Sequence, residues 1–319
     1  MWGLYSFNRK DLGGSILIGS PSNQKIVVEL KGGLGNQMFQ YAAGRSLALD
    51  NGSQLILDCK LGFWLDKRYK RRFELSSFCL VYVESSLFQS LPFLIDRVLS
   101  LIVRLSDFEF RSVFSRSFFT ERNFEFVNLG DFFNDNRILW MTGYFQDPRY
   151  FLRNREIIYE ELRPPLPQSP EYIQIANLRH EYELIAIGFR FFEESPNPEA
   201  HARNGYEKTM LEYSDVIKSI RQSVKNPKFL VFSTEKFIDF SQLDLPENTL
   251  FITADRGFDD TLSTLWLLSM CRHHIFNNST FYWWGAALSG NNYDDLEQLI
   301  YCSDNFLNPR IALDDWRLF

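Results

Sequence analysis

The chain has 319 residues, a hydrophobic fraction of 45% and a formal net charge of −6. This length allows two domains of ordinary size with a cleft between them. The negative balance gives no general attraction for nucleic acid, so an anionic ligand needs local basic groups. The four cysteines have no Cys-x-x-Cys spacing, which argues against a disulfide framework or a zinc site and favours a reducing, cytoplasmic location.

Three segments bear on contact with a membrane. Residues 1–24 have neither the pattern of a signal peptide nor the length of a membrane span. The apolar stretch 91–105 carries three charged residues at a spacing typical of an amphipathic helix. We expect this helix to be buried, with a membrane-surface helix as the alternative. The basic run 67–72 predicts a solvated loop, with contact to phosphate, lipid headgroups or nucleic acid as the alternative.

The first predicted elements form a β-α-β unit over residues 25–58, with a glycine-rich turn between the first strand and the helix. Glycines at such a bend permit positive φ angles and a close approach, and the start of the helix presents unpaired N–H groups to an anion. Gly33, Gly35 and Asn36 are therefore candidate ligand contacts. The spacing matches neither the dinucleotide fingerprint nor a P-loop. A tight turn without a ligand is the alternative interpretation.

The proline-rich segment 163–170 predicts a linker, which divides the chain into domains 1–165 and 166–319. The segment 106–135, before the linker, is rich in phenylalanine and has no pattern that orders it. After the linker, short apolar runs alternate with helical patterns, which predicts a parallel sheet covered on both faces by helices. The predicted strands are 184–189, 229–232, 250–252 and 274–276, and the predicted helices are 206–224 and 261–270.

Polar residues follow the predicted strands of the second half. Ligands of parallel sheets bind at the carboxyl ends of the strands, where Arg190 and Ser233 fall. Arg190 can present its planar guanidinium group to a phosphate. An ion pair between Arg190 and Glu193 or Glu194 is the alternative, and the sequence leaves both open.

The last predicted strand is followed by Asn278, Ser279 and Thr280, directly before a helix. Their hydroxyl groups, backbone amides and the helix dipole could together hold a pyrophosphate. Capping of the helix by Ser279 or Thr280 explains the same residues without a ligand. Trp283 and Trp284 are expected in the core, because adjacent helical residues cannot both face one site.

Catalytic metal chemistry is not indicated by the sequence. The four histidines lack His-Glu-x-x-His spacing, and Asp-x-Asp does not occur. The Gly-x-Ser-x-Gly motif of many hydrolases is also missing. We therefore expect neither a metal nor a resident cofactor.

Three motifs, at residues 32–41, 143–151 and 278–286, resemble those of the α1,2-fucosyltransferases of glycosyltransferase family 11. The likeness covers most of residues 25–290. It implies a GT-B-like α/β fold, with two Rossmann-type domains facing a cleft. It also implies an inverting, metal-independent transfer from GDP-β-L-fucose to the 2-hydroxyl of a terminal galactose in an oligosaccharide or glycolipid. Such an enzyme would be cytoplasmic or peripheral at the inner face of a membrane.

The resemblance leaves two alternatives, a transferase for another GDP-activated 6-deoxy sugar and a non-catalytic carbohydrate-binding scaffold. The second gains weight because this chain has Gly188 and Phe191 where many members carry a histidine and a second arginine. We expect Glu193 to be the catalytic base, with Asp147 and Glu194 as alternatives and Arg190 assisting the leaving group. The implied donor contacts are Gly33, Gly35, Asn36, Arg190, Ser233, Asn278, Ser279 and Thr280, and the implied acceptor contacts are Gln37, Gln146 and Asp147.

Overall fold

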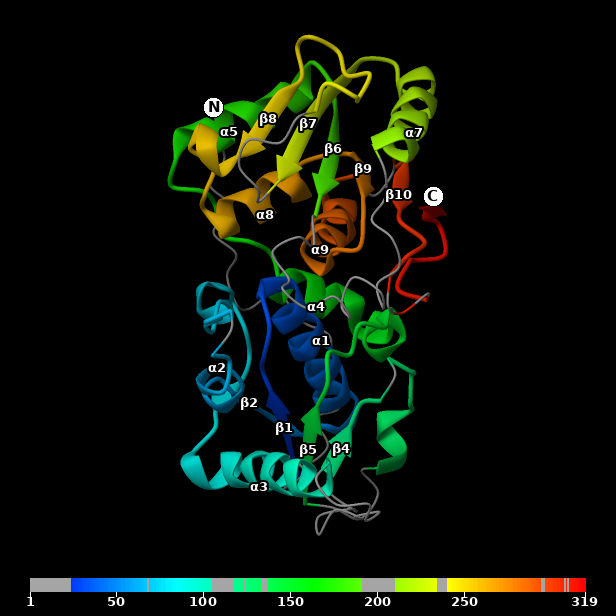
Figure 1. Ribbon diagram of the computed structural model, residues 1–319. Coiled ribbons are helices and arrows are strands. Elements are labelled where there is room, and N and C mark those ends of the chain that lie inside the picture. The colour runs from blue at the N-terminus through cyan, green and yellow to red at the C-terminus, as the bar shows by residue number, and fades with distance from the viewer. Residues whose placement is uncertain are drawn as a thin grey trace, which may run out of the picture.

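The computed structural model describes residues 24–67, 69–104, 118–122, 124–132, 137–190, 210–233, 240–293, 296–306, 308 and 310–319. Within these residues the strands form two parallel sheets, one of five strands and one of six. The sheets lie one above the other in Figure 1, each with its own helices. This confirms the predicted α/β class and its pair of Rossmann-type sheets.

The first sheet is built around the predicted β-α-β unit. β1 and β2 pair in parallel and are joined by α1, as expected for residues 25–58. The strand order is β3-β2-β1-β5-β4. The strands are β1 (Lys25–Glu29), β2 (Gln54–Asp58), β3 (Val83–Glu84), β4 (Phe118–Thr120) and β5 (Ile138–Thr142), and the helices before the linker are α1 (Leu34–Asn51), α2 (Leu61–Trp64), α3 (Leu87–Arg104) and α4 (Arg155–Glu161).

The second sheet contains the four strands predicted after the linker. Its strand order is β11-β10-β9-β6-β7-β8, and β6 pairs in parallel with both β7 and β9. The strands are β6 (Glu183–Phe189), β7 (Pro227–Ser233), β8 (Leu250–Thr253), β9 (His273–Phe276), β10 (Ile300–Cys302) and β11 (Arg317–Leu318), and the helices are α5 (Pro170–Asn177), α7 (Met210–Ser223), α8 (Thr261–Ser269) and α9 (Thr280–Ser289).

The linker region connects helices that pack on different sheets. Glu161, at the end of α4, accepts hydrogen bonds from Tyr41 and Arg45 of α1, at 2.6 and 2.7 Å. Tyr172 of α5 instead lies 3.4 Å from Thr264 of α8, measured between the hydroxyl oxygens. The boundary at residues 165 and 166, which lies between these helices, stays a prediction.

An aromatic cluster joins the two halves of the molecule. The ring of Phe39, on α1, lies 4.7 Å from the ring of Trp283 and 5.1 Å from that of Trp284, both on α9. Phe151 stacks on Trp284 with ring centroids 5.5 Å apart. All four side chains are fully buried, which confirms that both tryptophans belong to the core. Burial of such large rings stabilises the contact between the halves.

Gly35 lets the N-terminal ends of α1 and α9 meet. A Cβ atom at this position would lie 2.6 Å from the backbone nitrogen of Phe281 and 2.7 Å from Oγ1 of Thr280. The indole Nε1 of Trp284 donates a hydrogen bond of 3.1 Å to the Gly35 carbonyl. Because a backbone atom cannot move aside as a side chain can, this position requires glycine.

We expect Gly35→Ala to lower the free energy of unfolding by about 1–3 kcal/mol, because the added methyl group forces the two helices apart. Gly33→Ala is the matched control, since its Cβ would meet only the Arg71 guanidinium, at 3.8 Å. Urea unfolding of both variants measures the difference. Equal stability of the two variants would contradict the proposed close contact.

Candidate active site

A cavity of about 500 Å³ lies between the two sheets. Its walls come from the N-terminal ends of α1 and α9 and from the carboxyl ends of β6 and β7. The structure thus brings together most of the residues singled out in the sequence, although they lie more than 200 positions apart. The predicted residues that line the cavity are Gly33, Gly35, Asn36, Gln146, Arg190, Ser233, Asn278, Ser279 and Thr280.

Two helix N-termini converge on this cavity. α1 begins after Gly33, which has no side chain to cap it, and α9 begins after Ser279, whose side chain makes no capping hydrogen bond. The first amides of a helix have no partner within the helix and carry a partial positive charge. Arg71 and Arg190 also line the cavity. This arrangement suits an anion such as a diphosphate.

Asn36 bridges the two halves at the edge of the cavity. Its Oδ1 accepts one hydrogen bond of 3.0 Å from Oγ1 of Thr280 and another of 2.9 Å from Nε2 of Gln146. The hydroxyl of Thr280 therefore binds across the interface instead of capping α9. No acceptor for the Asn36 Nδ2 is found among the described residues, so this donor can serve a ligand.

Arg190 is held at the end of β6 by Asn277. The backbone nitrogen of Arg190 donates a 2.9 Å hydrogen bond to Oδ1 of Asn277, whose Nδ2 donates in return to the Arg190 carbonyl at 2.6 Å. Asn277 is buried, so both the oxygen and the nitrogen of its side-chain amide need such partners. The pair fixes the chain where Arg190 reaches the cavity.

Two acidic residues that the sequence analysis did not select, Glu74 and Asp259, also line the cavity. The Glu74 carboxylate accepts a hydrogen bond from the backbone amide of Leu34, at the start of α1, and burial raises the pKa of this carboxyl. Arg71 was likewise missed as a site residue, because it stands in a basic run that predicts a solvated loop. The sequence signal that could have identified Arg71 is the high density of basic residues in that run.

Two predicted acceptor contacts lie away from the cavity lining. Gln37 is fully buried, where its Nε2 donates to the Gly32 and Arg72 carbonyls and its Oε1 accepts from the Glu74 backbone amide. Gln37 thereby holds the segment that carries Arg71 and Glu74 against α1. Its direct contact with an acceptor stays a prediction.

Asp147, predicted both as an acceptor contact and as an alternative base, is also buried. Its carboxylate accepts two hydrogen bonds from the Arg149 guanidinium, at 2.9 and 2.6 Å, and one from Nδ2 of Asn308 at 3.2 Å. These hydrogen bonds engage both oxygens of the Asp147 carboxylate within the protein. Glu193 and Glu194 lie outside the described residues, and so does Phe191.

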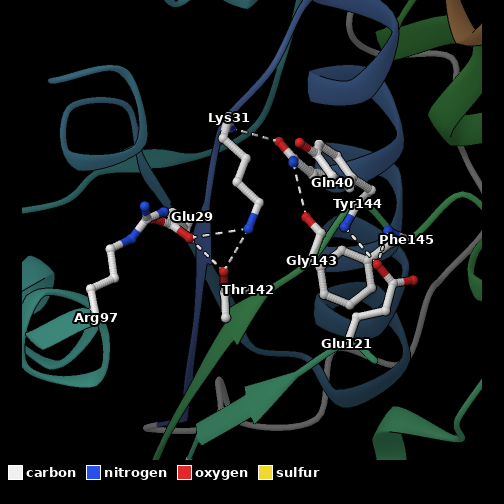
Figure 2. Close-up of polar contacts among 9 residues, drawn as sticks. All are labelled: Glu29, Lys31, Gln40, Arg97, Glu121, Thr142, Gly143, Tyr144 and Phe145. Carbon is white, nitrogen blue, oxygen red and sulfur yellow. Dashed lines mark hydrogen bonds and ion pairs between the residues drawn. The ribbon is translucent and has the colours of Figure 1, made fainter. Parts of the chain in front are cut away.

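The start of the second motif, residues 143–151, is held by Glu121, which follows β4, and by Gln40 of α1, as Figure 2 shows. The Oε2 of Glu121 accepts hydrogen bonds from the backbone amides of Tyr144 and Phe145, at 2.6 and 2.9 Å. Nε2 of Gln40 donates to the Gly143 carbonyl at 2.9 Å. Burial raises the pKa of the Glu121 carboxyl, although the two amides oppose that shift. This turn places the next residue, Gln146, in the cavity wall.

Gly188 explains one departure from the motif of the family that the sequence resembles. Where many members carry a histidine, a Cβ atom at Gly188 would lie 2.6 Å from the ring of Tyr282. The Tyr282 hydroxyl donates to the carbonyls of Phe189 and Phe232, at 3.1 and 3.2 Å, and the side chain lines the cavity. Tyr282 therefore occupies the space that a side chain at position 188 would take.

A double-mutant cycle tests whether the Tyr282 ring excludes a side chain at position 188. Gly188→Ala is expected to cost about 1–3 kcal/mol of unfolding free energy in the wild-type chain, because the methyl group overlaps the Tyr282 ring. The same change in a Tyr282→Ala background should cost at least about 1 kcal/mol less. Urea unfolding of the four proteins measures both values. Equal costs in the two backgrounds would show that Tyr282 is not what excludes a side chain there.

Two solved structures align with this chain, both at TM-scores below 0.5. A mutant of Arabidopsis thaliana FUT1 in complex with GDP aligns with a TM-score of 0.44 and 14% identity, over 87% of this chain and 70% of that one. Fucosyltransferase NodZ from Bradyrhizobium aligns with a TM-score of 0.41 and 12% identity, over 82% of this chain and 91% of that one. Likeness at this level says nothing of substrate.

Sequence relatives are more informative. An alpha-1,2-colitosyltransferase of Escherichia coli is 28% identical, over 84% of this chain and 88% of that protein. The O-antigen biosynthesis glycosyltransferase WbnK of Escherichia coli is 26% identical, over 83% of this chain and 90% of that protein. The sequence model described as Glycosyl transferase family 11 matches residues 78–317, which is most of the chain. The chain therefore belongs to glycosyl transferase family 11 and is a glycosyltransferase.

Proposed function

We propose that the protein transfers L-fucose from GDP-β-L-fucose to the 2-hydroxyl of a terminal galactose, with inversion at the transferred carbon. The observation that carries this proposal is the convergence of two helix N-termini with Arg71 and Arg190 on one cavity. A nucleoside diphosphate is the leaving group of such a transfer, and negative charge develops on it as the glycosidic bond breaks. Fixed amides and guanidinium groups stabilise this charge in the transition state.

The same groups would serve a metal-independent reaction. Two helix dipoles and two arginines supply positive charge at the position that a divalent cation would otherwise fill. The absence of a metal or cofactor requirement stays a prediction, and turnover in the presence of a chelator tests it.

A second donor is supported by the Escherichia coli relative named as a colitosyltransferase. Colitose is L-fucose without its 3-hydroxyl group, so the two sugars differ by one hydrogen-bonding group. A site that hydrogen-bonds a hydroxyl discriminates strongly against a sugar that lacks it, whereas an apolar site does not. GDP-colitose is therefore the alternative donor to compare with GDP-fucose.

The acceptor would enter beside Asn36 and Gln146 at the edge of the cavity, where Asn36 also accepts the hydrogen bond from Thr280 of the other half. Its hydroxyl would need a base to take up the proton, a contribution of about 10²–10⁴-fold. Glu193 follows Arg190 closely in the chain and remains the base that we propose. Glu74 is the alternative, because it lines the cavity and burial raises the pKa of its carboxyl toward the working range of a base.

Release of GDP from GDP-fucose and from GDP-colitose, over a panel of β-galactosides, tests the donor and the acceptor together. We expect acceptor-dependent turnover that yields an α1,2 linkage, and a loss of about 10²-fold in kcat/KM for Arg190→Ala. Arg221→Ala, on the exposed face of α7, is the matched control and should leave turnover unchanged.

Turnover with GDP-colitose alone would replace the proposed donor. GDP binding without turnover on any acceptor would instead favour the non-catalytic scaffold. A normal rate in Arg190→Ala would remove this arginine from the mechanism. The cytoplasmic location expected from the sequence stays a prediction.

The base is tested by two isosteric variants. Glu193→Gln should lower kcat by at least about 10²-fold while GDP affinity stays near that of the wild type, because an amide cannot take up the acceptor proton. Glu74→Gln should retain most of the turnover. Single-turnover rates and calorimetric GDP titrations measure the two quantities. Loss of turnover in Glu74→Gln, with normal turnover in Glu193→Gln, would assign the base to Glu74.

A further inference from the structure

α3 buries Phe93 against the first sheet but turns an apolar stripe toward solvent, so the expectation of a buried helix holds for one face only. Leu87, Leu91, Leu94 and Val98 follow one another at intervals of four, three and four residues, so they share one face of the helix. All four are exposed, and Leu87 is 85% exposed. Phe88, beside Leu87, is 84% exposed. Exposed apolar side chains gathered in one place mark an interaction surface.

An ion pair at the edge of the stripe ties α3 to the first sheet. The guanidinium of Arg97 lies 2.5 Å from the carboxylate of Glu29, which is almost completely buried at the end of β1 (Figure 2). The same carboxylate accepts a hydrogen bond from Oγ1 of Thr142 and lies 3.6 Å from Nζ of Lys31. Removal of one partner from such a buried cluster is costly, so α3 cannot simply roll its apolar face inward.

α2 extends the stripe. Trp64 is 65% exposed and, with Lys60, borders the groove that Leu87, Leu91 and Leu94 line from α3. The exposed side chains of Trp64, Leu87, Phe88, Leu91 and Leu94 are called the α2–α3 face from here on.

Basic residues lie on the α2 side of this face, although the whole chain is acidic. Segment 60–72 contains six basic residues and one acidic residue, against a net charge of −6 for the chain. Lys60, Lys67 and Lys70 are exposed, and Nζ of Lys67 lies 5.4 Å from the Trp64 ring centre. The single acidic residue, Asp66, accepts hydrogen bonds from backbone amides of its own loop.

We propose that the α2–α3 face binds the surface of a membrane that contains anionic lipids. Exposed leucine, phenylalanine and tryptophan side chains beside lysines have the composition of an interfacial membrane contact, in which the apolar groups enter the headgroup boundary and the cations meet anionic headgroups. Among the described helices none is long and apolar enough to cross the bilayer, so contact by this face is peripheral. In a symmetric dimer this face would meet its own copy and bring like-charged lysines together, whereas an anionic lipid surface offers them opposite charge.

The position of the face relates it to the cavity. The loop that carries Lys67 beside Trp64 continues to Arg71, which lines the cavity between the sheets. If the proposed transfer holds, this loop would bring the cavity close to an acceptor carried by a membrane lipid. The binding proposal itself requires neither donor nor acceptor.

Cosedimentation of the full chain with vesicles tests the proposal, with vesicles of phosphatidylcholine alone compared with vesicles in which about a third of the lipid is phosphatidylglycerol. We expect binding to the anionic vesicles that weakens as salt is raised. Lys60→Glu with Lys67→Glu should lower partition at least about 25-fold, since each lysine contributes about fivefold. Leu87→Ser with Phe88→Ser and Leu91→Ser should lower it at least about tenfold.

Matched changes on α7 and in the turn that follows it serve as controls. Leu211→Ser and the pair Lys218→Glu with Lys225→Glu replace exposed residues there and should leave partition unchanged. Thermal unfolding and sedimentation velocity of each variant verify the fold and the oligomeric state. Absence of binding to anionic vesicles, equal loss in the controls, or a dimer that only the α2–α3 variants dissolve would overturn the proposal.

Discussion

The structure depends on the close contact between the N-terminal ends of α1 and α9. Gly35 permits it, because a side chain there would overlap the backbone of α9. The hydrogen bonds from Thr280 to Asn36 and from Trp284 to the Gly35 carbonyl then fix the register of the two halves. One contact therefore aligns two helix dipoles on one cavity and closes the aromatic core behind them. Glycine serves the interface here, rather than only the approach of a ligand.

Much of the fold follows from patterns of short range. The apolar runs that became β1, β2 and β6 to β9 were identified because buried parallel strands are continuously apolar. The strands β3, β4, β5, β10 and β11 were not predicted. β4 lies in the phenylalanine-rich segment 106–135, which has no regular pattern, and β3, β10 and β11 have only two or three residues each. For α3, the sequence indicated an amphipathic helix but not which face is buried. The buried face carries Phe93, which packs against Val27 and Ile56 of the first sheet, and Arg97 beside it pairs with Glu29, 68 positions away.

The residues of the site were predictable where they depend on topology, and not where they depend on contacts between distant segments. Residues at strand ends and helix starts were placed together, because parallel topology collects these positions at one edge. Gln37 and Asp147 were not separable from them by motif alone. Their partners, the Arg72 carbonyl and Asn308, come from distant segments, and only the structure shows that these partners saturate them. The contact between Gly188 and the Tyr282 ring is of the same kind, since the two residues belong to motifs far apart in the sequence and meet only in the fold.

A crystal structure of the protein with GDP would test the diphosphate site most directly. We expect pyrophosphate oxygens within hydrogen-bonding distance of backbone amides in the first turns of both α1 and α9, and of the Arg190 guanidinium. A pyrophosphate held by the second sheet alone, with no contact to α1, would contradict this expectation. The GDP complex would also show whether Gly35 only joins the two halves or contacts the nucleotide as well.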